Sequence, residues 1–90
     1  MDLNTFKSTL EQDGFGEIET KSYAGNLFNS VHSHPFDVRA QMLAGELTLV
    51  CEGQPHTYRT GEVFTMAAGC EHTEQFGAEG ATYIVGRKRT

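Results

Sequence analysis

The chain has 90 residues, and its twelve acidic residues against seven basic ones give a formal net charge of −5. We expect no nucleic-acid partner, because proteins that bind phosphate backbones neutralise them with Lys and Arg. No apolar run approaches the roughly 20 residues that cross a bilayer, and the start Met-Asp-Leu-Asn lacks the pattern of a signal peptide. We therefore expect a cytoplasmic protein with no membrane segment.

The first segment predicts a short helix over about residues 4–13. Asn4 or Asp2 can serve as its N-cap, because a short polar side chain accepts a hydrogen bond from the first turn. Phe6 and Leu10 stand four residues apart, so they share one face of the helix and can pack it onto the rest of the chain.

From Glu17 onward the sequence changes to short strand-like segments separated by Gly, Pro and Asn. The predicted strands cover residues 17–24, 27–34, 38–44, 46–52, 56–60, 62–66, 71–76 and 81–86. We interpret Ala44-Gly45 and the stretch from Gly77 to Gly80 as turns, because glycine reaches backbone conformations that other residues avoid. This spacing predicts a sandwich or barrel over about residues 17–86, within a single all-β domain over residues 1–90.

Three of the four histidines are candidate metal ligands. In His32-Ser33-His34 the two imidazoles are two residues apart, so on a strand they point to the same side. One ion can bind both at metal–nitrogen distances of about 2.0–2.2 Å. A third histidine, His72, follows a strand-like segment and a glycine turn, whereas His56 lies in a predicted hairpin where we expect it to be exposed.

The arrangement of histidines and glycines resembles the two signature motifs of the cupin family. The first motif is matched by His32-x-His34 and by the ending Leu43-Ala44-Gly45-Glu46-Leu47. The second motif is matched in register by Gly61, Gly69 and His72. The resemblance covers about residues 25–86. It implies a double-stranded β-helix, the jelly-roll barrel of the cupins, with the three histidines converging inside its mouth, and it also implies a homodimer.

The chain departs from the family's pattern at the carboxylate ligand. The family's glutamate would fall at Val38, and Asp37 stands one residue early. On a regular strand Asp37 points the wrong way, unless a bulge or a tight turn brings it in. Ala67 replaces the proline of the second motif, and Phe76 stands where that motif has Asn. Asp37 is therefore one candidate for a fourth metal ligand.

Glu74 is the second candidate acid. It lies two residues after His72, so it points into the barrel if His72 does. A buried carboxylate needs a partner, because burying it bare costs several kcal/mol. Glu74 therefore either supplies the missing oxygen ligand or acts beside the metal as a catalytic acid or base. At the rim of the barrel it would face solvent instead.

Three neutral imidazoles with open positions suit a divalent transition metal ion (Zn, Fe, Ni, Mn or Cu), and the residues alone do not choose among these. We expect either a small metal-dependent enzyme of the dioxygenase or isomerase sort, acting on a small molecule in the barrel, or a non-catalytic module that binds or senses such a molecule, with or without metal. Cys51 and Cys70 form no CxxC motif and are too few for a disulfide framework, so we expect inert thiols.

Overall fold

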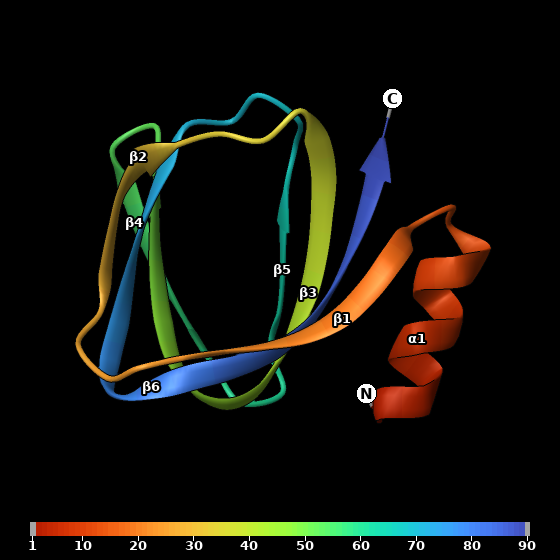
Figure 1. Cartoon of the computed structure of the whole chain (residues 1–90), viewed down its shortest axis with the longest axis horizontal. Helices are drawn as coiled ribbons and strands as arrows, with labels where there is room; N and C mark the ends of the chain where they lie inside the picture. The colour runs from red at the N-terminus through yellow and green to blue at the C-terminus, as the bar shows by residue number, and fades with distance from the viewer. Residues whose placement is uncertain (1, 90) are drawn as a thin grey trace.

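The computed structural model describes residues 2–89 as a β-barrel with a short helix packed beside it (Figure 1). In chain order the elements are α1 (Leu3–Gln12), β1 (Gly16–Tyr23), β2 (Phe28–His32), β3 (Phe36–Cys51), β4 (Gln54–Arg59), β5 (Val63–Met66) and β6 (His72–Arg89). Over this described part of the chain, no helix has the length and apolar character needed to span a membrane. The all-β fold with one short helix is the fold class that the sequence predicted.

Helix α1 covers an outer face of the barrel wall. Asp2 is its N-cap, because the Asp2 side chain accepts a 2.9 Å hydrogen bond from a backbone amide of the first turn. Phe6 and Leu10 are fully buried and pack against Ile84 of β6, in a cluster separate from the barrel interior. The neighbouring Tyr83 belongs to the interior cluster. Both faces of this part of β6 are therefore buried.

Strands β3 and β6 form a long antiparallel ribbon on which the barrel is built. Their pairing runs from Phe36 opposite Arg89 to Cys51 opposite His72. The six strands are hydrogen-bonded into a single sheet, which folds over into two facing sheets. The first half of β3 and the second half of β6 lie in one of these, flanked by β5 and β1. The other halves lie in the second, flanked by β4 and β2. The two sheets face each other across the core, which is the double-sheet jelly roll expected from the sequence (Figure 1).

The sequence analysis predicted turns at Ala44-Gly45 and at Gly77 to Gly80, and these two predictions were wrong. The ribbon bends at these places without ending either strand. The expected strands merge into two longer ones: 38–44 and 46–52 into β3, 71–76 and 81–86 into β6. Gly45 (φ 77°) and Gly80 (φ 74°) lie at the bend, where the pairing of β3 with β6 shifts register. A Cβ atom on Gly45 would overlap the Gly80 carbonyl. Glycine here allows two paired strands to bend together, because their backbones meet too closely for any side chain.

The barrel interior is filled by alternating side chains from both sheets. Its buried residues are Val38, Ala40, Met42, Leu47, Leu49, Phe64, Phe76, Ala81, Tyr83 and Val85. The spacing of two along β3 and β6 follows from the alternation of side chains on a strand. The same alternation at the start of β6 buries two polar side chains, His72 and Glu74.

The contact between Gly45 and Gly80 predicts a steric effect that a matched control can isolate. Gly53 also has a positive φ, of 76°, but a Cβ atom there would meet nothing within 4 Å. We expect Gly53→Ala to lower the free energy of unfolding by about 1–2 kcal/mol, the strain of a left-handed alanine. Gly45→Ala should lower it by clearly more, because it adds the clash with the Gly80 carbonyl. Urea denaturation measures both, and equal losses would contradict this account of the bend.

Candidate metal centre

The three imidazoles predicted as ligands come together at one end of the barrel. His32 is the last residue of β2, His34 follows in the connection to β3, and His72 begins β6 directly opposite His32. One nitrogen from each ring lies within 4.8 Å of those from the other two. Three nitrogens grouped in this way could bind one ion, since zinc binds histidine nitrogen at roughly 2.0–2.1 Å.

Backbone carbonyls fix the orientation of two of these rings. The Nδ1 atom of His32 lies 2.8 Å from the Ser30 carbonyl oxygen, and that of His72 lies 3.0 Å from the Cys70 carbonyl oxygen. A carbonyl only accepts, so each Nδ1 carries the proton and donates it. In the neutral ring, each Nε2 is then left with a lone pair. This arrangement is the usual support of a metal-bound histidine.

Glu74 adds a carboxylate to this group of lone pairs. Its two oxygens lie 3.8 Å from His32 Nε2 and 4.0 Å from His72 Nε2, and the side chain is only 9 % exposed. The Asn29 amide donates a 2.8 Å hydrogen bond to Oε1 of Glu74. Among the described residues, the buried Nε2 of His72 has no hydrogen-bond partner. The cluster thus consists of acceptors facing one another, which a cation stabilises, and so the residues present fit a metal ion.

His34 is held as a neutral imidazole. Burial lowers its pKa below the ordinary 6.5, and the neighbouring rings of His32 and His72 lower it further, whereas Glu74 opposes the shift. The His34 ring also stacks on Phe36, with the ring centroids 5.0 Å apart. Because metals bind the neutral form, the lowered pKa keeps this nitrogen available as a ligand to lower pH.

The lowered pKa of His34 predicts how the metal-free protein responds to acid. Below pH 6.5 the imidazole of the unfolded chain binds a proton that the folded state does not, so the stability of the folded state falls as the pH drops. We expect His34→Gln to reduce this loss between pH 7 and pH 5. Urea denaturation of the metal-free wild type and variant at both pH values measures the difference. An identical loss in the two proteins would show that His34 titrates normally.

The structure does not bring Asp37 into this group. Its Oδ1 accepts a 2.8 Å hydrogen bond from the Ala68 amide, so it supports the turn before Cys70. The reason is strand parity, because the adjacent Val38 points into the core and Asp37 therefore points away from it. Of the two acids considered from the sequence, Glu74 is the one beside the imidazoles.

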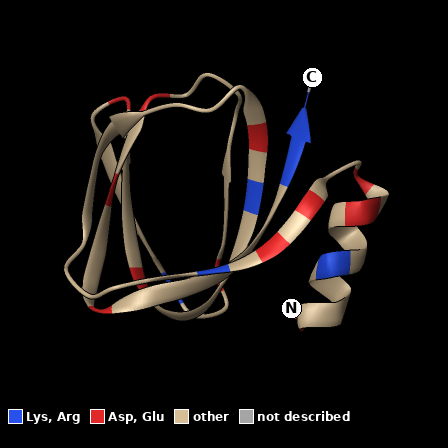
Figure 2. Ribbon diagram, in the orientation of Figure 1, with Lys and Arg blue, Asp and Glu red and all other residues tan. Residues whose placement is uncertain are grey.

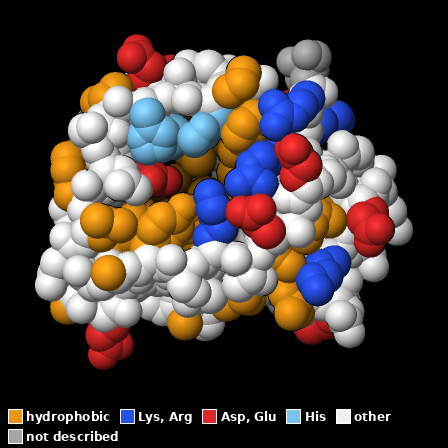
Figure 3. Space-filling model, in the orientation of Figure 1, with side chains coloured by type: hydrophobic (Ala, Val, Ile, Leu, Met, Phe, Trp, Pro, Cys, Tyr) orange, Lys and Arg blue, Asp and Glu red, His pale blue; other side chains and the backbone are white. Residues whose placement is uncertain are grey.

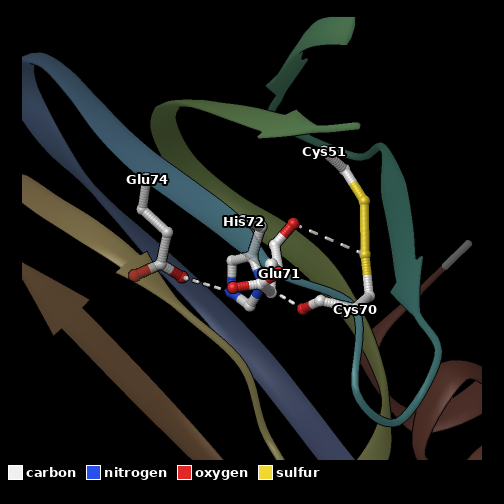
Figure 4. Close-up of a disulfide and its surroundings, with 5 residues drawn as sticks. All are labelled: Cys51, Cys70, Glu71, His72 and Glu74. Carbon is white, nitrogen blue, oxygen red and sulfur yellow. Dashed lines mark hydrogen bonds and ion pairs between the residues drawn. A yellow bond between two sulfur atoms is a disulfide. The ribbon is translucent and has the colours of Figure 1, made fainter. Parts of the chain in front are cut away.

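Cys51 and Cys70 form a disulfide next to the site (Figure 4), so the expectation of inert thiols was wrong. Cys51 lies opposite His72 in the β3–β6 register, and Cys70 supplies the carbonyl that holds the His72 ring. The two cysteines are 19 residues apart, and no local pattern links them. Disulfides are typical of oxidising environments, and the cytoplasmic location expected from the sequence stays a prediction.

A cavity of about 50 Å³ opens beside the imidazoles. Its lining includes His34 and Glu74 together with two cations, Lys21 and Arg87. In the space-filling view the histidines and a group of basic side chains lie on the same face with apolar side chains between them (Figure 3). The sequence analysis missed these two cations. The alternation of residues 83, 85 and 87 along β6 could have placed Arg87 on the inner face.

The barrel has the cupin fold, as comparison with solved structures shows. A cupin-2 domain protein from Shewanella frigidimarina matches with a TM-score of 0.70 at 18% identity, over 99% of this chain and 94% of that one. A cupin domain from Schizosaccharomyces pombe matches with a TM-score of 0.74 at 11% identity, over 81% and 55%. The DMSP lyase DddQ from Ruegeria pomeroyi matches with a TM-score of 0.71 at 21% identity, over 79% and 36%.

At these identities the likeness shows the fold alone. No protein-family model matches the sequence, and no curated protein matches it. The chain spans less than two thirds of the length of several of the structures that it matches. The matched structures include a named lyase and domains whose names give no activity, so the fold does not define a reaction.

Proposed function

We propose that this protein is a metal-dependent enzyme that acts on a small molecule bound in the mouth of the barrel. The observation that carries the proposal is a cluster of hydrogen-bond acceptors. The Nε2 atoms of His32 and His72, whose Nδ1 atoms lie against backbone carbonyls, are 3.8 and 4.0 Å from the buried carboxylate of Glu74. His32, His34 and His72 would hold a divalent transition metal ion. A bound ion of this kind acts as a Lewis acid that polarises an oxygen atom of a substrate or activates water.

Glu74 is the residue that we assign as catalytic acid or base. It lines the cavity with His34, so a molecule there meets its carboxylate. Asn29 donates to Oε1 and fixes the carboxylate, while Oε2 lies on the side of His72. A positioned carboxylate moves protons to or from a bound substrate. The apolar walls of the cavity exclude water from this step, because Phe36, Val38 and Phe64 line it.

Metal loading tests the ligand assignment. Elemental analysis of the purified protein should find about one transition metal ion per chain, as three histidine ligands predict. The triple variant His32→Ala, His34→Ala, His72→Ala should lose it. The control is His56→Ala, because His56 stacks on Tyr58 outside the cluster and its loss should leave the metal content unchanged. Metal retained in the triple variant would refute the assignment.

Glu74→Gln separates an acid or base from a metal ligand. The glutamine keeps the size of the side chain and an oxygen for the Asn29 hydrogen bond, but it removes the charge and the proton-transfer chemistry. Glu74 lies outside the group of three converging ligands, but its buried carboxylate lies beside two of them, so we expect Glu74→Gln to weaken Zn²⁺ binding less than His72→Ala does in a chelator competition assay. The exposed Glu79→Gln is the matched control and should bind like the wild type. A loss of affinity in Glu74→Gln as large as that in His72→Ala would make this carboxylate a ligand.

The partners expected from the sequence are a small-molecule ligand and a second copy of the chain. The first is part of the function proposed here. The homodimer stays a prediction, to which the exposed apolar side chains of Phe28 and Val31 on β2 lend support.

A further inference from the structure

The cavity beside the imidazoles is also lined by two cations. Lys21 comes from β1 and Arg87 from β6, and both contribute to the cavity that His34 and Glu74 line. The ribbon view shows basic residues on β1 and at the C-terminal end of β6, where the two strands run side by side (Figure 2). The metal centre proposed above does not use either cation.

The pairing of β1 with β6 explains why these side chains point inward. Lys21 stands directly opposite Tyr83, and paired residues on antiparallel strands project from the same face. Tyr83 belongs to the interior cluster, so Lys21 projects to the interior too. Arg87 is four residues after Tyr83 and therefore shares its face. The Arg87 side chain is only 16 % exposed, which is unusual for a cation and indicates a fixed position.

A carboxylate of the chain itself already bridges this cation pair. Oε1 of Glu19 lies 3.4 Å from Nη2 of Arg87 and 3.9 Å from Nζ of Lys21. One carboxylate oxygen is thus within reach of both cations. The Glu19 side chain is 49 % exposed, so it can turn out into solvent when another anion arrives. Arg87 otherwise donates to the Glu17 carbonyl, and a guanidinium has five N–H donors.

Tyr83 belongs to the same cavity lining. Burial above all raises the pKa of Tyr83, the neighbouring Tyr23 and the Glu74 carboxylate add to the rise, and the Arg87 guanidinium opposes it. The volume of about 50 Å³ sets the size of an occupant. Since one water needs roughly 10–15 Å³ of such space, the cavity takes roughly three to five non-hydrogen atoms.

We propose that the molecule bound in this cavity is a small carboxylic acid whose carboxylate replaces Glu19 on Lys21 and Arg87, while its other end faces His34 and Glu74. This inference names the substrate class of the proposed function and rests on it. Arg87 then provides specificity, because a guanidinium binds a carboxylate through charge-assisted hydrogen bonds. The apolar side chains between the two polar ends contact the short carbon chain. Glu19 acts as an internal competitor that keeps the cation pair occupied in the absence of the acid.

The test compares propanoate with propanamide, which has the same shape but no charge. The ¹H–¹⁵N NMR spectrum of the full chain is recorded during each titration, both with Zn²⁺ and after treatment with EDTA. Propanoate should shift the amide signals of Lys21, Tyr83 and Arg87, and propanamide should not. Lys21→Met and Arg87→Met should each weaken propanoate binding by about tenfold or more, the usual loss of a charged hydrogen bond. Glu19→Gln should strengthen it by removing the competitor.

Lys88→Met is the matched control, since it makes the same change in net charge on the exposed outer side, where Lys88 lies over Phe15. It should bind propanoate like the wild type. The dispersion of the NMR spectrum shows whether each variant folds. If Arg87→Met fails to fold, Lys21→Met alone still tests the inference. Equal binding of propanamide, or equal affinity in Lys21→Met and Lys88→Met, would overturn the inference.

The two titrations also separate this inference from the proposed function. Propanoate binding that depends on Lys21 and Arg87 in a chain that holds no metal would support the cation pair and refute the metal enzyme. Metal binding in a chain whose propanoate affinity does not depend on Lys21 and Arg87 would support the metal enzyme and refute the cation pair.

Discussion

The antiparallel ribbon of β3 and β6 is the constraint on which the whole barrel depends. Each strand crosses both sheets, so the ribbon must bend in the middle, and it does so where Gly45 meets Gly80. The bend brings the two halves of the ribbon face to face and encloses the apolar core. The remaining strands add to its edges. The same register that builds the core places Cys51 beside His72 at one end.

At one end of the barrel, several hydrogen-bond acceptors lie close together at the edge of the apolar interior. Backbone carbonyls at Ser30 and Cys70 take the Nδ1 protons of two histidines and leave lone pairs directed at Glu74. In a low-dielectric environment such a group is unfavourable until a cation joins it. Lys21 and Arg87 belong to the lining of the same cavity and are paired with Glu19, the carboxylate that we propose a bound acid replaces. The cavity lining therefore combines groups that favour a bound cation with groups that bind an anion.

The candidate site could be predicted in part because it follows the two-residue period of a strand. His32 and His34 share a side, and Glu74 shares the side of His72, which the burial of His72 and Glu74 bears out. Parity also explains why Asp37, beside the inward Val38, lies outside the cluster. The bend at Gly45 was not predictable in the same way. A glycine with a positive φ can either end a strand or bend it. Which of the two happens depends on the partner strand that pairs with it.

By itself, the sequence determined the all-β fold, the helix at its start, the three candidate histidines and the shared face of His72 and Glu74. These features depend on alternation, caps and glycine spacing, which act over a few residues. The tertiary structure decided the continuity of β3 and β6, the pairing of Cys51 with Cys70, and the position of Lys21 and Arg87 in the same cavity lining as His34. These features depend on register between strands far apart in the chain, which is set by how the whole core packs together and leaves no local pattern.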